Sequence, residues 1–535
     1  MKPFAELLDR LVLTPSRNGK LRLLVDYIRA TPDPNRGYAI AAITRDLDIP
    51  SVKPAMIRGL VEERVDPILF GYSYDFVGDM AETISLIWPD QKTDCASTEM
   101  TLSNVVETLQ SASRAEGPKL VEGWLDQLDD QGRYALIKLI TGGLRIGVSS
   151  RLIKQALADF GEKDVNEIEE LWHGLEVPYL DLFAWLEGTA EKPESAAASP
   201  FRPPMLATPT DAEELTKYAP TDYAAEWKWD GIRVQVTCER GVPRIYSRTG
   251  DDISKSFPDL LAKMDFEGSI DGELLVGRHG EAGIEVGTFG DLQQRLNRKT
   301  VSAKKQAEFP VFVRAYDLLQ EGDENLRPLS FKERRNRLET FVPSLDPQRF
   351  DISELVSFDD WDQIATLRNN PPSPIIEGLM LKRWDSVYVP GRPKGPWFKW
   401  KRDPFLVDAV LMYAQRGHGK RSSFYSDFTF GVWTGPDDDP QIVPVGKAYF
   451  GFTDDELKQL DKYVRDNTIE RFGPVRSVRA EPDHGLVLEI AFEGLNRSTR
   501  HKSGVAMRFP RISRLRWDKP AREADRIETL EAMLA

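Results

Sequence analysis

Residues 228–233 of the chain have the sequence K-W-D-G-I-R, in which a lysine, an aspartate, a glycine and an arginine stand at short spacing. A lysine amine is a nucleophile only after it loses its proton, and its ordinary pKa is about 10.4. Burial, a bound metal or a cation such as Arg233 lowers that pKa and favours a reactive Lys228. The simpler interpretation is a surface turn in which Asp230 and Gly231 connect two strands. The motif alone does not decide between the two.

Further motifs follow Lys228 in a fixed order along the chain. Taken singly, each has an ordinary explanation as strand acids, a core aromatic residue or a solvated strand face. Their occurrence together in one order along the chain is much harder to explain in that way. The motifs are S-R-T-G at 247–250, I-D-G-E-L-L at 270–275, R-A-Y-D-L-L at 314–319, I-E-G-L-M-L-K at 376–382, W-F-K-W-K-R at 397–402 and R-F-P-R-I-S-R-L-R-W-D-K at 508–519.

The residue types in these motifs suit attack on a phosphate. Negative charge gathers on the non-bridging oxygens, and Lys, Arg and Mg²⁺ stabilise it. Mg²⁺ prefers one or two carboxylates together with substrate oxygens, which fits Glu273 and Glu377. Lys399 and Lys401 are two residues apart, so on a strand both face the same side. We therefore expect two cations over one phosphate.

Length and composition predict a multidomain protein. The 535 residues are too many for one hydrophobic core, and about three domains are expected. Helical spacing of apolar residues dominates the first part, with a break at Gly142-Gly143 and Ser149 or Ser150 as the next N-cap. Short β-rich runs dominate the rest, with one helix at 454–467 in the last part. We predict an all-α domain at 1–187, a linker at 188–200, an α+β domain at 201–402 and an all-β small barrel at 403–535.

Net charge by itself argues weakly against nucleic-acid binding, because it is −14 at pH 7. The basic residues are clustered, however, and residues 494–516 contain no acid. A basic run is normally a solvated face. Here it alternates with apolar residues, which predicts strands with one buried side. Its basic members are Arg497, Arg500, Lys502, Arg508, Arg511, Arg514 and Arg516.

The cysteine content predicts a reducing compartment. Cys95 and Cys238 are too few for a disulfide framework or a four-cysteine zinc site. The acidic N-terminal segment lacks the apolar run of a secretory signal, and no apolar stretch is long enough to span a bilayer. We expect a cytoplasmic protein.

The ordered motifs resemble all six motifs of the covalent nucleotidyltransferases, which include ATP-dependent DNA ligases, RNA ligases and mRNA capping enzymes. The resemblance covers 201–535 and implies an α+β nucleotidyltransferase (ATP-grasp-like) adenylation domain followed by an all-β OB-fold domain. L-R-I-G-V-S-S-R-L-I-K-Q-A-L-A at 144–158 is similar to the signature of the helical DNA-binding domain of larger DNA ligases of bacterial or archaeal type. T-F-G-D-L-Q-Q-R-L-N-R-K at 288–299 resembles a further ligase segment. The resemblance therefore favours an ATP-dependent DNA ligase.

The resemblance also implies residue roles. Lys228 would carry AMP as a phosphoramidate, and Glu377 and Glu273 would bind Mg²⁺ or Mn²⁺, with Glu273 also near the ribose. ATP would be the substrate, nicked duplex DNA the partner, and the protein a monomer that grips the duplex with its helical domain. The implied nucleotide contacts are Glu226 and Trp227 at adenine, Tyr316 stacked on adenine, Arg233 and Arg248 at nucleotide and nick phosphates, Lys399 and Lys401 at the α-phosphate, and Arg508, Arg511, Arg514, Asp518 and Lys519 at the pyrophosphate.

Three steps follow from the resemblance: transfer of AMP from ATP to Lys228, transfer to the 5′-phosphate of a nick, and attack by a 3′-hydroxyl with release of AMP. Because two substrates share one site, we expect a hinge near 402–404. The main alternative is an RNA ligase or capping-type nucleotidyltransferase, which usually lacks the helical domain. A DNA-binding protein without catalysis is a second alternative, and an NAD-dependent ligase is disfavoured by the two cysteines.

Overall fold

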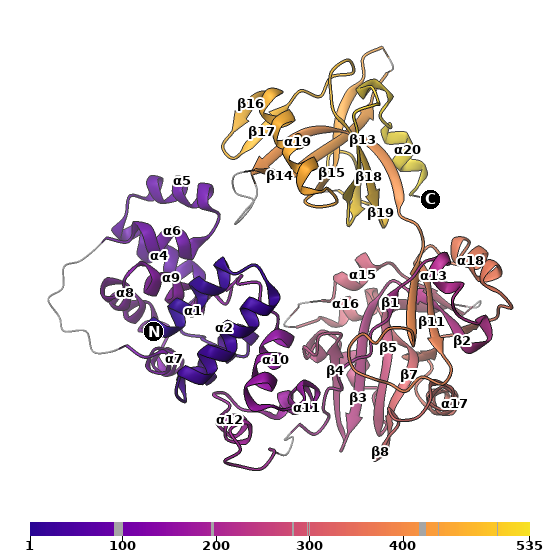
Figure 1. The fold of residues 1–535 in the computed structure, drawn as a ribbon, viewed down its shortest axis with the longest axis horizontal. Coiled ribbons are helices and arrows are strands. Elements are labelled where there is room, and N and C mark those ends of the chain that lie inside the picture. Colours follow the sequence, from indigo (N-terminus) through magenta and orange to yellow (C-terminus); the bar gives the residue numbers. More distant parts are fainter. Residues whose placement is uncertain are drawn as a thin grey trace. The chain divides into compact units, whose positions relative to one another are not determined.

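The computed structural model describes residues 1–89, 100–193, 197–280, 283–296, 298, 300–416, 424–436, 438–499 and 501–534. The chain forms two compact units, Met1–Arg402 and Asp403–Ala535 (Figure 1). Three residues named in the sequence analysis, Cys95, Lys299 and Arg500, lie outside the described residues. Every described helix falls short of the length and apolarity that crossing a bilayer requires.

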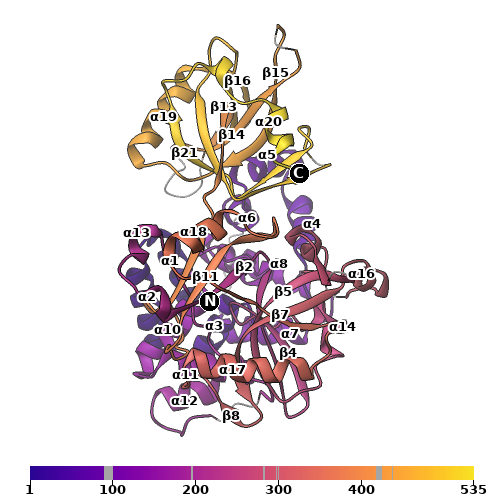
Figure 2. The same ribbon diagram turned by 90° about the vertical axis from the view of Figure 1, so that its right-hand side faces the viewer.

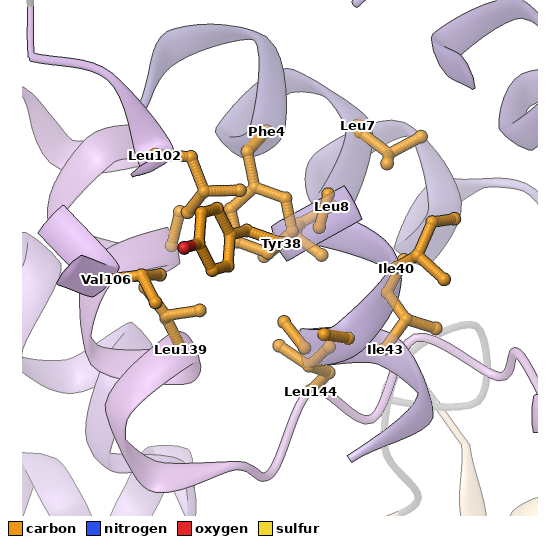
Figure 3. Packing of buried hydrophobic residues seen from close by; sticks show 14 of the residues in the cluster. Phe4, Leu7, Leu8, Tyr38, Ile40, Ile43, Leu102, Val106, Leu139 and Leu144 are labelled. Carbon is orange, nitrogen blue, oxygen red and sulfur yellow. The ribbon is translucent and has the colours of Figure 1, made fainter. Parts of the chain in front are cut away.

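The first part of the larger unit is helical, as the spacing of its apolar residues predicts. Figure 3 shows side chains of the first, third, seventh and ninth helices packed on one another, among them Phe4, Tyr38, Val106 and Leu139. The helices are α1 (Lys2–Leu13), α2 (Arg17–Ala30), α3 (Asn35–Thr44), α4 (Pro54–Arg64), α5 (Pro67–Val77), α6 (Met80–Ile87), α7 (Leu102–Ser111), α8 (Gly117–Gln127), α9 (Asp130–Thr141), α10 (Ser150–Gly161), α11 (Val165–Leu171), η1 (Trp172–Gly174) and α12 (Leu180–Leu186).

The predicted break between two of these helices is confirmed. Helix α9 ends at Gly142, whose φ of +67° is a left-handed conformation that glycine adopts without strain. Helix α10 begins after Ser149, whose hydroxyl accepts a hydrogen bond from the Leu152 N–H at 3.2 Å. The L-R-I-G segment therefore forms the connection between two buried helices.

Two mainly antiparallel sheets follow. The first has the strand order β1 (Thr208–Pro209), β12 (Trp397–Lys401), β11 (Ile376–Arg383), β2 (Tyr223–Trp229) and β10 (Leu355–Val356). The second has the order β4 (Val242–Ser247), β3 (Ile232–Glu239), β5 (Gly268–Gly280), β7 (Val311–Glu321) and β8 (Glu324–Asn325), with β6 (Gly283–Val286) beside β5 and β9 (Phe350–Ile352) beside β7. The accompanying helices are α13 (Ala212–Leu215), α14 (Pro258–Leu261), α15 (Phe289–Gln293), α16 (Ala303–Glu308), α17 (Phe331–Phe341) and α18 (Trp361–Asn369).

The K-W-D-G-I-R motif connects these two sheets. Lys228 is near the end of β2 and Arg233 near the start of β3, so Asp230 and Gly231 form the crossing between them. A Cβ on Gly231 would lie 2.5 Å from the Leu274 carbonyl oxygen, so only glycine allows this close approach. Asp-Gly therefore does join two strands, but it joins strands of different sheets rather than forming a surface hairpin.

The smaller unit is β-rich. Its longest strand, β13, pairs with β18 along its first half and with β14 and β17 further on, which curls the sheet (Figure 2). Helix α19 buries Leu457, Leu460 and Val464 against it and starts with a capping box at Thr453. The elements are β13 (Phe405–Arg416), β14 (Tyr425–Thr434), β15 (Gln441–Ala448), α19 (Asp454–Asp466), β16 (Thr468–Phe472), β17 (Val475–Val478), β18 (Val487–Phe492), β19 (Gly494–Arg497), β20 (Val505–Arg508), β21 (Arg511–Arg516) and α20 (Ile527–Ala532).

Candidate functional site

Strand register brings three lysines to one face of the first sheet. Strand β11 lies between β2 and β12, and Gly378 is the partner of both Lys228 and Lys401. Lys399 lies two residues before Lys401 on β12 and therefore faces the same side. The side-chain alternation of a strand is what lets residues far apart in sequence converge here.

Glu377 is the direct partner of Lys228. Its Oε2 lies 2.6 Å from the Lys228 Nζ and 3.5 Å from the Lys401 Nζ. The register between β11 and β2 shifts between Ile376 and Gly378, so Glu377 is the extra residue of a bulge. In a regular strand the side chains alternate between the two faces, and a bulge changes the direction in which the extra residue points. Burial alone would raise the pKa of Glu377, but Lys228 and Lys401 outweigh it and lower that pKa.

Glu273 lies beside this pair from the second sheet. Its Oε1 accepts a hydrogen bond from the Gly231 N–H at 3.2 Å, at the crossing between the sheets. Burial raises the pKa of Glu273 to about 7, although the nearby charges of Lys228 and Arg233 act in the opposite direction. The negative charge of Glu377 raises it further. The two carboxylates are therefore close enough to repel each other.

Arg233 is held by acceptors of the protein. Its Nε and Nη2 donate to the two Asp271 carboxylate oxygens at 3.0 and 2.5 Å, and Nη1 donates to the Met205 carbonyl at 2.7 Å. The Tyr388 hydroxyl donates to Asp271 at 2.6 Å. Burial would lower the pKa of Arg233, but Asp271 raises it well above the ordinary value. Arg233 neutralises Asp271, and its expected phosphate contact stays a prediction.

Glu226 lies in a buried ion-pair network. Its carboxylate is 2.5 Å from the Lys382 Nζ and 3.2 Å from the Arg335 Nη1. Burial raises the pKa of Glu226, and the two cations offset part of that shift. The Lys382 Nζ also donates to the Tyr316 carbonyl at 3.2 Å and lies 4.5 Å from the centre of its ring. Tyr316, on the second sheet, and Glu226, on the first, are thus connected through Lys382.

Positive charge accumulates around Lys399. Burial lowers the pKa of Lys399, and so do the nearby charges of Arg392, Lys401, Lys228 and Arg248, in that order. Cations gathered this closely repel one another, so the arrangement is stabilised when a polyanion binds. The charge pattern fits a phosphate chain.

The last motif belongs to the smaller unit and forms a separate group. Arg508 ends β20, and Arg511 and Arg514 lie on β21. The Lys519 Nζ is 2.7 Å from an Asp408 carboxylate oxygen, and Asp518 pairs with Arg516 at 3.0 Å. Pyrophosphate contacts of these residues stay predictions.

Glu273 and Glu377 suit a divalent cation that is also bound by substrate oxygens, rather than a metal ion that is coordinated by protein ligands alone. Within the described residues there is no group of three or more His, Cys, Asp or Glu side chains that could hold a metal. Glu273 and Glu377 supply two carboxylates, one of which has a pKa raised to about 7. Two carboxylates completed by substrate oxygens are the environment in which Mg²⁺ binds beside phosphates. The residues present therefore fit Mg²⁺ held jointly with a nucleotide.

Several residues of this site were not predicted from the sequence. Asp271 lies within the quoted I-D-G-E-L-L motif and Lys382 ends I-E-G-L-M-L-K, so the sequence contains a signal for both residues. Arg335, Tyr388 and Arg392 lie outside the motifs and carried no signal in the sequence alone. Only the folded chain brings them to Glu226, Asp271 and Lys399.

The fold and the lysine-centred site define a nucleotidyltransferase domain, and comparisons with known proteins extend this. Residues 1–158 match the model of the DNA ligase N terminus, 204–401 that of the ATP dependent DNA ligase domain, and 421–519 that of the ATP dependent DNA ligase C terminal region. The chain is 30% identical to "Probable DNA ligase" of Koribacter versatilis, over 99% of this chain and 96% of that protein. It is 29% identical to "DNA ligase 1" of Korarchaeum cryptofilum, over 99% and 97% of the two chains.

The chain belongs to the family of ATP-dependent DNA ligases. A solved structure titled "Pmar-Lig_PreS3" has the same fold, with a TM-score of 0.58 over 96% of this chain and 99% of that one at 15% identity. The predicted fold class, a helical domain, a nucleotidyltransferase domain and a β-rich domain, is confirmed.

Proposed function

We propose that the protein seals nicks in duplex DNA through a lysyl-AMP formed on Lys228. The observation that carries the proposal is the position of the Lys228 amine, 2.6 Å from Glu377 and among the charges that surround Lys399. A nucleophile beside a carboxylate and a set of cations is what attack at a phosphorus atom requires. Membership of the DNA ligase family supports ATP as the nucleotide and nicked DNA as the acceptor.

In the first step, the Lys228 amine attacks the α-phosphorus of ATP, a nitrogen–phosphorus bond forms, and pyrophosphate leaves. The amine must lose its proton before it attacks, and Glu377 is the carboxylate that orients it, 2.6 Å from the Lys228 Nζ. Lys399 and Lys401 stabilise the charge on the α-phosphate oxygens. Glu226, main-chain groups of Trp227, and Tyr316 are proposed to hold the adenine.

In the second and third steps, the 5′-phosphate of the nick takes AMP from Lys228, and the 3′-hydroxyl then displaces AMP. Arg233 and Arg248 are proposed to hold the 5′-phosphate. Bound Mg²⁺ neutralises phosphate charge, and Glu273 and Glu377 are the residues that would hold it. The exchange of ATP for DNA at one site is proposed to use a hinge at 402–404, with Arg508, Arg511, Arg514, Asp518 and Lys519 serving the pyrophosphate.

The proposal also includes a monomeric protein that works in the cytoplasm, with the helical domain at 1–187 holding the duplex and 188–200 as linker. The content of two cysteines supports a reducing compartment. The match of residues 1–158 to the DNA ligase N terminus supports a role of this region in ligation.

Labelling with ATP tests the reactive lysine. Lys228→Ala removes the nucleophile, so label from α-labelled ATP should no longer attach to the protein, whereas the wild type should carry acid-labile label that chases onto nicked DNA. Lys255→Ala is the matched control, because Lys255 lies in a short 3₁₀ helix (Ser254–Ser256) after β4 and outside the site. Label retained at another residue in the Lys228→Ala variant would refute the assignment.

The same assay separates the alternatives. Labelling by GTP but not ATP would indicate a capping-type enzyme, and sealing confined to nicked RNA would indicate RNA repair. Absence of any label in the wild type would leave a DNA-binding protein without catalysis.

A further inference from the structure

The smaller unit has a surface cleft that the site around Lys228 does not use. The cleft lies between helix α19 and the turn after β21, and its volume is about 450 Å³. The side chains from α19 are three or four residues apart and therefore share one face of the helix. The residues that line the cleft are Gln459, Lys462, Tyr463, Asp466, Asn467 and Trp517.

Trp517 forms a half-exposed aromatic wall of this cleft. Its side chain is 52% exposed and belongs to the turn that directly follows β21. The turn is anchored, because the Lys519 N–H donates to the Arg516 carbonyl at 3.2 Å and the Lys519 Nζ lies 2.7 Å from Asp408. The Tyr463 ring meets the indole at 63°, with 5.7 Å between the ring centroids. The indole is thus held in position while about half of its surface stays accessible.

Polar side chains with unused hydrogen-bonding capacity complete the cleft. Across the described residues, the side chains of Gln459, Lys462 and Asp466 make no hydrogen bond and no ion pair. Lys458, one turn earlier on the same helix, is by contrast paired with Asp455 at 2.9 Å. The cleft therefore presents a free cation, a free carboxylate and a free amide beside an aromatic ring.

We propose that this cleft binds a nucleotide, with the base stacked on Trp517 and the phosphate at Lys462. Bases of any sequence stack on accessible aromatic side chains, because every base has a π-face. The Lys462 ammonium balances the phosphate charge. The Gln459 amide and the Asp466 carboxylate can bind the donors and acceptors on the edge of a base. A volume of about 450 Å³ lies within the range of sites for small ligands.

This second nucleotide site belongs to the smaller unit, whereas Lys228 belongs to the larger one, so the inference does not rest on the proposed function. An apolar peptide fits the cleft less well, because it would leave the polar groups of Gln459, Lys462 and Asp466 without partners. Free AMP and an unpaired nucleotide of a DNA strand present the same chemistry, a base with a phosphate.

Photolabelling of the full-length protein tests the inference. The probes are azidoadenosine monophosphate and a single-stranded oligonucleotide that carries an azidoadenine, and mass spectrometry maps the crosslinked peptides. Label should reach the peptide of α19 that contains Lys462 and the peptide that contains Trp517. The probe that labels these peptides at the lower concentration identifies the source, a free nucleotide or a DNA strand.

Variants of the cleft are compared by the probe concentration that labels the α19 peptide. Trp517→Ala should raise that concentration roughly 5- to 100-fold, the range for a lost stacked base, and Trp517→Phe should recover part of the loss. Lys462→Ala should raise it roughly 2- to 5-fold. Lys458→Ala is the matched control, because it removes the same charge one turn earlier, and it should label like the wild type. Thermal unfolding checks that each variant is folded.

The inference is overturned if neither peptide is labelled in the wild type. Equal labelling of wild type and Trp517→Ala, or of Lys462→Ala and Lys458→Ala, would overturn it as well. Label on peptides of the larger unit would report the site around Lys228, which keeps failure of the proposed function distinguishable from failure of this inference.

Discussion

Asp271 and Arg233 form a buried charge pair between β5 and β3 of the second sheet. The Asp271 side chain is 2% exposed, and both of its oxygens accept hydrogen bonds from Arg233. Tyr388 adds a third hydrogen bond. When one member of such a pair is removed, the other is left charged in a medium of low dielectric constant. The pair therefore holds Arg233, and with it the start of β3, in a single orientation.

Asp271→Asn keeps the shape of the side chain and removes its charge. We expect the free energy of unfolding to fall by about 3–5 kcal/mol, because buried Arg233 loses its counter-ion. Urea denaturation measures the change. Asp351→Asn is the matched control. It breaks the pair between Arg314 and Asp351, whose side chain is 24% exposed. The free energy of unfolding should fall by roughly 1 kcal/mol. Equal losses in the two variants would contradict the argument.

At the scale of elements, the bulge in β11 decides how Lys228 and Glu377 meet. Regular alternation would place Glu377 and Lys228 differently, and the bulge brings the carboxylate to the amine. Gly378 follows directly, with φ of +149°, a conformation that other residues rarely adopt. A Cβ at this position would lie 2.2 Å from the Trp400 carbonyl oxygen. The glycine is what allows β12 to approach β11 beside Lys228.

Gly378→Ala should therefore lower the free energy of unfolding by at least about 3 kcal/mol, from backbone strain and overpacking together. Self-adenylation should fall as well, because the strand that carries Lys401 is displaced. Gly494→Ala is the matched control, since Gly494 is also a strand glycine and a Cβ there meets nothing within 4 Å. Denaturation and labelling with ATP measure the two effects. An alanine tolerated at 378 without loss of stability would show that β12 can shift away.

At the scale of the whole larger unit, the helical region packs against the two-sheet region through aromatic and charged contacts. The His173 ring lies 4.7 Å from the ring of Tyr246 and 6.0 Å from that of Phe201, measured between centroids. Arg327 and Glu170 form an ion pair at 2.6 Å. Burial, followed by the charge of Lys154, lowers the pKa of His173 to about 4. His173 is therefore neutral in the folded protein over the physiological range.

This contact predicts a pH dependence of stability. The unfolded chain takes up a proton on His173 near pH 6.5, whereas the folded chain does so only near pH 4, so the contribution of His173 is complete above pH 6.5 and is lost as the pH falls from 6.5 to 4. The loss amounts to about 3 kcal/mol. His173→Phe removes the titration, so the difference in unfolding free energy between wild type and variant should change over this window in urea titrations. His484→Gln, at an exposed histidine, is the control variant.

Family, fold class and the order of the parts were predictable from the sequence, because each depends on local signals. A few neighbouring residues are enough to show helical spacing, a run of strand length or the break at Gly142. The ordered motifs around Lys228 indicate the chemistry. The two-residue spacing of Lys399 and Lys401 predicted a shared face, and they do lie on one strand.

Only the tertiary structure decided how the charges are partnered. The pairing of Glu226 with Lys382 and Arg335, of Arg233 with Asp271, and of Lys228 with Glu377 depends on register and on a bulge, which set the positions of residues distant in sequence. A one-residue shift in register turns every side chain of a strand to the other face. Local sequence specifies that a residue is charged, whereas the packing of the two sheets determines whether its charge is neutralised by a partner or left available for a phosphate.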